Sequence, residues 1–196
     1  MIWEIGISFI LCRDNFYSIP FFERPYKPGK KFCATLISNG GPYLRRNFFE
    51  ALSKYKKVDS AGRWNNNIGY HVENKTKFLQ DYKFSMAFEN SEHSGYCTEK
   101  LTDSFAGHTI PIYWGDPDVN VIFNTKAFVW VKNEQDFDRA IQEIIKIDND
   151  EELYKSMLKE RVFNDPQYVQ KEREKLRKFF RNIFDVDKEK ARRIGK

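Results

Sequence analysis

The chain has 196 residues, which is enough for one domain with its own hydrophobic core and short for two. Apolar residues make up 41% and charged residues 31%, and 33 basic against 28 acidic residues give a net charge of +5. This balance is typical of a globular protein and permits an anionic partner without selecting one. The cysteines are Cys12, Cys33 and Cys97. They form no CxxC pair, which argues against a zinc knuckle and a disulfide framework and indicates a reducing compartment.

The first eleven residues, MIWEIGISFIL, are apolar except for Glu4. They are too short to span a bilayer and lack the basic start of a signal peptide. The segment from Asn15 to Lys31 carries three prolines and clustered charge. We therefore interpret residues 1–31 as a linker or extended arm that precedes the folded domain.

From Phe32 onward, apolar strand-like runs alternate with helical spacing. In chain order we expect a strand at Phe32–Ser38, a helix at Tyr43–Tyr55, a short strand at Val58, a short helix near residues 75–82, a strand at Lys83–Phe88, a helix at Thr98–Gly107, strands at Thr109–Gly115 and Ala127–Val131, and helices at residues 134–147 and 151–163. Thr98 is expected to cap its helix and Gly107 to occupy the C′ position.

This alternation predicts an α/β fold, with a Rossmann-like, mostly parallel sheet flanked by helices over residues 32–165. Ligands of such sheets bind beyond the carboxyl ends of the strands, near helix N-termini. The stretch AFENSEHSGYCTEKL (Ala87–Leu101) lies at such a place, between a predicted strand and a predicted helix.

The chemistry of this stretch suits a sugar nucleotide. The first turn of a helix has unpaired N–H groups, and Lys100 adds a cation, so the two together can hold a phosphate. Glu99 is an acceptor that fits the vicinal hydroxyls of a ribose, and Asn90 and Tyr96 add donors and a ring face. The alternative is that Glu99 only complements the helix dipole and that the turn is a solvated cap.

The sequences FENSEHSGYCTEKL and AGHTIPIYWG resemble the donor-binding signature of the α1,3/α1,4-fucosyltransferases. Upstream, FCATLISNGGPYLRRNFFEAL and VDSAGR resemble the approach to that signature, so the similarity covers Pro25–Phe163 and is strongest to bacterial members. The resemblance implies the C-terminal half of a GT-B glycosyltransferase, a fold of two Rossmann-like halves facing a cleft. It also implies that residues 1–31 are the remnant of an acceptor-binding half.

The resemblance assigns roles to particular residues. It implies that Lys100 holds the phosphates of GDP-fucose, that Glu99 takes the ribose hydroxyls and that Asn90 and Tyr96 line the donor pocket. Arg63, the only arginine of its loop, is expected at the β-phosphate, so Lys100 and Arg63 are the predicted catalytic residues.

Three further positions precede that loop. Ser38 and Asn39 either meet phosphate or simply make a turn. Arg45 either belongs to the donor site or forms a salt bridge on a helix face.

The implied reaction is an inverting transfer, in which an acceptor hydroxyl attacks fucose C1 opposite the leaving GDP. Fixed cations at the β-phosphate stabilise the charge that develops there, so neither a cofactor nor a metal is required. Asp116 and Asp118 form a DPD sequence that mimics a metal-binding motif, and we interpret it as a turn or helix start.

The general base belongs to the acceptor half in this family, for which there is no room before Phe32. We therefore expect this chain alone to transfer fucose weakly or not at all. The expected acceptor is a glycan with an N-acetyllactosamine-like unit. The alternatives are a non-catalytic nucleotide-sugar-binding fragment and a GT-B transferase with a different nucleotide sugar. No nucleic-acid recognition motif is present.

The tail, residues 166–196, is basic and carries Leu176, Phe179, Phe180, Ile183 and Phe184 at helical spacing. It is predicted to be an amphipathic helix. We favour packing of its apolar face on the body or on the other half over peripheral contact with an anionic membrane. The expected location is the bacterial cytoplasm, with the inner membrane as the surface for any peripheral contact.

Overall fold

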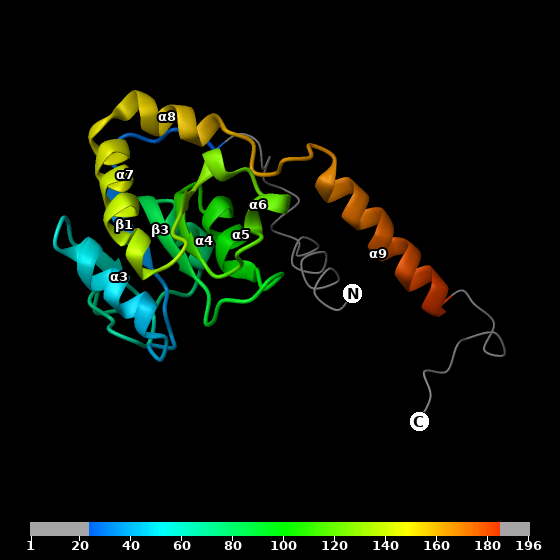
Figure 1. Cartoon of the computed structure of the whole chain (residues 1–196), viewed down its shortest axis with the longest axis horizontal. Helices are drawn as coiled ribbons and strands as arrows, with labels where there is room; N and C mark the ends of the chain where they lie inside the picture. Colours follow the sequence, from blue (N-terminus) through cyan, green and yellow to red (C-terminus); the bar gives the residue numbers. More distant parts are fainter. Residues whose placement is uncertain (1–23, 185–196) are drawn as a thin grey trace.

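The computed structural model describes residues 24–184 and contains a five-stranded, fully parallel sheet (Figure 1). The strand order is β2-β1-β3-β4-β5. The strands are β1 (Lys31–Thr35), β2 (Val58–Ser60), β3 (Tyr82–Phe88), β4 (Ile110–Trp114) and β5 (Val129–Trp130). The predicted α/β fold with a parallel sheet is therefore confirmed.

The helices follow the predicted order, with ends shifted by a few residues. They are α3 (Tyr43–Ser53), α4 (Lys75–Leu79), α5 (Glu99–Ala106), α6 (Val119–Ile122), η1 (Thr125–Ala127), η2 (Glu134–Asp136), α7 (Phe137–Asn149), α8 (Glu151–Lys159) and α9 (Tyr168–Phe184). Most of the connections between strands are helical, which is why neighbouring strands run parallel.

Alternating side chains of the central strands pack against helices on both faces of the sheet. Phe84, Met86 and Phe88 belong to the larger core cluster, which also takes in residues of α3, α7 and α8. Ala87 and Tyr113 belong to the cluster that contains residues of α5 and α6. Burial on both faces of the sheet explains why the sequences of the strands are continuous apolar runs.

Helix α5 begins after the predicted cap residue, but its capping contact and its C-terminal end differ from the prediction. Thr98 is the N-cap residue, but its side chain makes no capping hydrogen bond. Gly107 is the C-cap with φ −75°, and the left-handed residue is His108 with φ 53°. The expectation that Gly107 occupies C′ is therefore wrong, because the left-handed turn occurs one residue later.

Arg24 belongs to the packed domain, although it lies in the segment interpreted as a linker. It is 5% exposed, and its guanidinium donates to the carbonyl oxygens of Thr109, Ala127 and Met157. Residues 1–23, with Cys12, lie outside the described residues.

Helix α9 is amphipathic, as predicted, and extends away from the sheet and its helices (Figure 1). Leu176 is buried, whereas Phe179, Phe180, Ile183 and Phe184 are exposed. The predicted packing on the body therefore holds for Leu176 and does not extend to the four residues that follow, for which packing on the other half stays a prediction. Residues 185–196 lie outside the described residues. Within residues 24–184, no helix has the length and apolar character needed to cross a bilayer.

Candidate active site

The order in which strands are added to the sheet reverses between β1 and β3. The chain passes from β1 through α3 to β2 on one side and returns through α4 to β3 on the other. Such a switch point opens a crevice at the carboxyl ends of the two strands, and this is where ligands of parallel sheets bind. The structure has a cavity of about 260 Å³ at this place.

The cavity is lined by the ends of β1 and β3 and by the first turns of α5. Its lining contains Ala34, Thr35, Leu36, Ile37, Ser38, Asn39, Arg45, Lys75, Leu79, Ser85, Met86, Phe88, Asn90, Glu99, Lys100, Asp103 and Ser104. Six of the eight predicted site residues are in this set, namely Ser38, Asn39, Arg45, Asn90, Glu99 and Lys100. Residues from distant parts of the sequence are thus brought together at one edge of the sheet.

Arg63 and Tyr96 are not in the lining. Arg63 is exposed on the loop that follows β2. Tyr96 is half-buried, and its ring lies edge-on to His93 at 6.5 Å between ring centroids. Their predicted roles toward the donor stay predictions.

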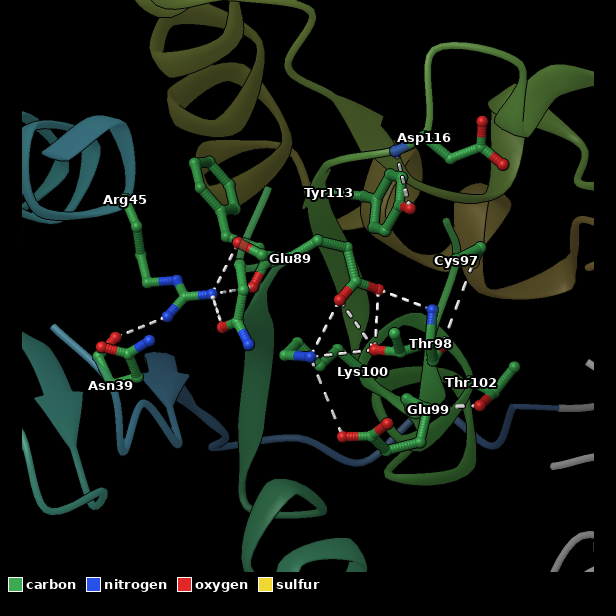
Figure 2. Close-up of polar contacts among 12 residues, drawn as sticks. Asn39, Arg45, Glu89, Cys97, Thr98, Glu99, Lys100, Thr102, Tyr113 and Asp116 are labelled. Atoms are coloured by element: carbon green, nitrogen blue, oxygen red, sulfur yellow. Dashed lines mark hydrogen bonds and ion pairs between the residues drawn. The ribbon is translucent and has the colours of Figure 1, made fainter. Parts of the chain in front are cut away.

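Lys100 lies on the first turn of α5 and is held by two neighbours. Its Nζ donates to Glu89 Oε2 at 2.8 Å and to Thr98 Oγ1 at 2.9 Å, and it lies 3.8 Å from Glu99 Oε1 (Figure 2). The side chain of Lys100 is 29% exposed and that of Glu99 is 36% exposed. The ammonium and the Glu99 carboxylate therefore both remain within reach of a molecule in the cavity.

Glu89 is an acidic residue of the site that was not among the predicted site residues. It follows β3 directly and is fully buried. Its Oε1 accepts from the backbone N of Thr98 at 2.7 Å. The signal in the sequence is an acidic residue at the end of an apolar strand, where no solvated position is expected.

Gly115 makes room for Glu89. It has φ 152°, and a Cβ on this residue would lie 2.4 Å from Glu89 Cγ and 2.6 Å from Glu89 Cβ. Any larger residue there would displace the carboxylate, because real Cβ atoms do not come so close to other carbons.

Arg45 joins the two strand ends at the cavity (Figure 2). Its Nη1 donates to the carbonyl oxygen of Asn39 at 2.6 Å. Its Nη2 donates to the carbonyl oxygens of Phe88 at 2.8 Å and Glu89 at 2.6 Å, and to Asn90 Oδ1 at 2.9 Å. Arg45 is 2% exposed, so the alternative of a salt bridge on a helix face is wrong. Burial lowers the pKa of its guanidinium, and Glu89 and Tyr96 oppose that shift.

Asn39 lines the cavity, and the loop after β2 packs against the segment that follows β1. Asn39 Oδ1 accepts from the backbone N of Gly41 at 2.9 Å, which closes the turn that the sequence analysis allowed for. Gly62 lets the two loops approach, because a Cβ there would lie 1.8 Å from the carbonyl oxygen of Ile37. Ser38 is exposed at the rim.

The DPD sequence fixes the loop that precedes α5. Asp116 Oδ1 accepts from the backbone N of Gly95 and of Asp118, both at 2.9 Å. Asp118 accepts from the hydroxyl of Ser94. The predicted turn is therefore present. Among residues 24–184, no group of three or more His, Cys, Asp and Glu side chains is arranged to hold a metal ion.

Comparisons with known proteins agree on one family. A model of the C-terminal region of glycosyltransferase family 10 (fucosyltransferase) matches residues 26–191. The α-(1,3)-fucosyltransferase FucT of Helicobacter pylori is 38% identical over 168 residues, which is 83% of this chain and 35% of that protein. The 3-galactosyl-N-acetylglucosaminide 4-α-L-fucosyltransferase FUT3 of Bos taurus is 30% identical over 128 residues, or 63% of this chain and 34% of that one.

Solved structures give the same result. A crystal structure of an α1,3-fucosyltransferase with GDP-fucose superposes with a TM-score of 0.71 at 34% identity, covering 94% of this chain and 54% of that one. The chain thus spans about half the length of that fucosyltransferase, and 35% of the Helicobacter protein.

Proposed function

The chain belongs to glycosyltransferase family 10, the fucosyltransferases, and from this premise we propose that it is the donor-binding half of an inverting GT-B fucosyltransferase that uses GDP-fucose. The observation that carries the proposal is the cavity at the carboxyl ends of β1 and β3, with Lys100 and Glu99 together on the first turn of α5.

The phosphates of the donor are proposed to bind at the start of α5. The helix dipole and the unpaired N–H groups of its first turn favour an anion, and Lys100 adds a full charge. Glu99 lies beside Lys100, and its carboxylate suits two neighbouring ribose hydroxyls, because it accepts hydrogen bonds and donates none. Asn90 and Ser38 supply polar groups on the opposite walls of the cavity.

The proposed reaction breaks the bond between fucose C1 and the β-phosphate oxygen of GDP while an acceptor hydroxyl attacks C1 from the opposite face. The hydroxyl loses its proton to a general base, and the electron pair of the broken bond remains on the β-phosphate. A fixed ammonium stabilises this growing charge most strongly in the transition state. With Lys100 in that role, and Arg63 as the second predicted cation, the proposed step requires no metal.

The proposed acceptor is a glycan with an N-acetyllactosamine-like unit. Its support is the name of the Bos taurus relative, which specifies a galactosyl-N-acetylglucosaminide. We expect the other half of the enzyme to bind most of the acceptor and to supply the general base. This chain alone is therefore expected to bind GDP-fucose without appreciable transfer to N-acetyllactosamine, which a radiochemical transfer assay measures directly.

Calorimetric titration tests the donor site. GDP-fucose, GDP and UDP are titrated into the wild type, Lys100→Ala and the control Lys77→Ala, whose lysine is exposed on α4 and does not line the cavity. We expect GDP-fucose and GDP to bind, UDP to bind at least roughly tenfold more weakly, and only Lys100→Ala to lose affinity. Equal affinities for UDP and GDP would instead favour a transferase that uses another nucleotide sugar.

The exposed apolar residues of α9 suggest a membrane surface as a second partner, because phenylalanines and basic residues share this helix. We favour packing on the rest of the enzyme, and expect anionic liposomes to float the chain equally with and without residues 171–196. Flotation that requires this segment would establish the peripheral membrane contact.

A further inference from the structure

The buried carboxylate of Glu89 is the centre of the polar network beneath the cavity (Figure 2). Besides the backbone N of Thr98, it accepts from Thr98 Oγ1, at 2.8 Å from Oε1 and 2.7 Å from Oε2, and from Lys100 Nζ at 2.8 Å. Glu89 is 0% exposed, so no water competes for these contacts. A buried carboxylate is costly unless it is paired and hydrogen-bonded, and Glu89 meets both conditions.

Counting the donors of Lys100 shows what this network leaves available. An ammonium has three N–H groups and no acceptor. Two of them are directed to Glu89 Oε2 and Thr98 Oγ1, and the Glu99 carboxylate lies 3.8 Å from the nitrogen, beyond hydrogen-bond distance. Because Lys100 and Glu99 both line the cavity, the remaining N–H has only this longer contact to Glu99 and can donate to a ligand there.

Thr98 connects the two charged groups. The Thr98 hydroxyl donates to the Glu89 carboxylate and accepts from Lys100. The orientation of the hydroxyl therefore depends on Glu89, and the orientation of the Lys100 ammonium depends on Glu89 and Thr98. This explains why Thr98 does not cap α5 with its own side chain. The Glu89 carboxylate takes the backbone N–H of Thr98 instead, near the positive end of the helix dipole.

We propose that Glu89 is a positioning residue: directly and through Thr98 it holds the Lys100 ammonium so that one N–H is aimed into the cavity at a diphosphate oxygen. This rests on the proposed function. The Glu89 carboxylate and the Lys100 ammonium form an ion pair at 2.8 Å, so the affinity for a diphosphate should depend on the direction of that N–H as well as on charge. Removing the Thr98 hydroxyl should then weaken diphosphate binding although Lys100 keeps its full charge.

The test compares Thr98→Val, which keeps the shape of threonine and removes the hydroxyl, with Thr98→Ser, which keeps the hydroxyl and removes the methyl group. GDP and guanosine are titrated into the full 196-residue chain by NMR, and thermal melting verifies that each variant is folded. We expect Thr98→Val to bind GDP roughly tenfold more weakly and Thr98→Ser to bind it within roughly twofold of wild type. Guanosine affinity should change less than roughly twofold in both, because guanosine carries no phosphate.

Glu89→Gln removes the charge at nearly constant shape and should behave like Thr98→Val. If this variant does not fold, the Thr98 pair decides the question. Equal GDP affinity in Thr98→Val and Thr98→Ser would overturn the proposal. A parallel loss of GDP and guanosine affinity in Thr98→Val would also overturn it, because such a loss indicates a general structural role.

A ligand-free readout separates this proposal from the proposed function. The acetylation rate of Lys100 with a small reagent, followed by mass spectrometry, reports how firmly its ammonium is held. We expect a rate increase of roughly fivefold or more in Thr98→Val and none in Thr98→Ser. If the wild type binds no GDP, the donor-site proposal fails for this chain, and unequal Lys100 rates still establish that the network positions the lysine. Equal rates would refute that positioning.

Discussion

Arg45 supports a quantitative prediction, because one buried guanidinium satisfies oxygens from two separate turns. Replacing it by methionine, which has similar reach and no donor, leaves the carbonyl oxygens of Phe88 and Glu89 buried without this partner. Each orphaned buried acceptor costs about 1–3 kcal/mol. Relief from burying the guanidinium charge offsets part of the loss. We expect Arg45→Met to lower the free energy of unfolding by about 3 kcal/mol.

Urea denaturation followed by tryptophan fluorescence measures this change. The matched control is Arg46→Met, because Arg46 is the next residue on α3 and is exposed. A loss of about 3 kcal/mol corresponds to a drop in Tm of roughly 6–12 °C for a domain of this size. GDP affinity should also fall in Arg45→Met, since Asn39 and Asn90 both line the cavity. A difference between the two variants below about 0.5 kcal/mol would refute the reasoning.

Three other predictions concern stability, ligand binding and pH. Gly115→Ala should cost about 2–3 kcal/mol of unfolding free energy in urea, because its Cβ would overlap Glu89; an unchanged midpoint would contradict this. Lys75→Ala should weaken GDP binding by roughly twofold to fivefold in calorimetry, whereas Lys77→Ala, on the same helix but outside the cavity, should not. Burial, with a smaller effect of a neighbouring lysine, lowers the pKa of Lys30 from 10.5 to about 8. Between these values the unfolded chain binds more protons, so this residue makes stability rise with pH. Lys30→Met should remove part of the rise measured between pH 7.5 and pH 10, and identical slopes would speak against it.

The sheet and most helices could be predicted because their signals are local. The residues of β3 and β4 alternate between two buried faces, and the apolar spacing of α7 repeats with the period of a helix. The location of the site followed from the same pattern, since parallel strands place their carboxyl ends at one edge. Lys100, Glu99 and Asn90, which line the cavity, could be selected as candidates because their residue types suit a nucleotide and lie in one short stretch.

The remaining features depend on contacts between distant segments. Glu89 gains its role only when the start of α5 and Gly115 are brought against the end of β3. The acceptors of Arg45 come from positions up to 45 residues away, so neither predicted alternative described them. Lys75 lines the cavity only because α4 returns the chain past the switch point. No local spacing contains this information.

Every residue that lines the cavity lies between Ala34 and Ser104, and the supporting contacts described above extend to Asp118. The proposed donor site is therefore encoded in one uninterrupted stretch of fewer than half the residues of the chain. A site of this kind can be inherited and grafted as a unit. Enzymes that share a nucleotide sugar but decorate different glycans can then diverge by exchanging or reshaping the other half, while the charged network under α5 stays as it is.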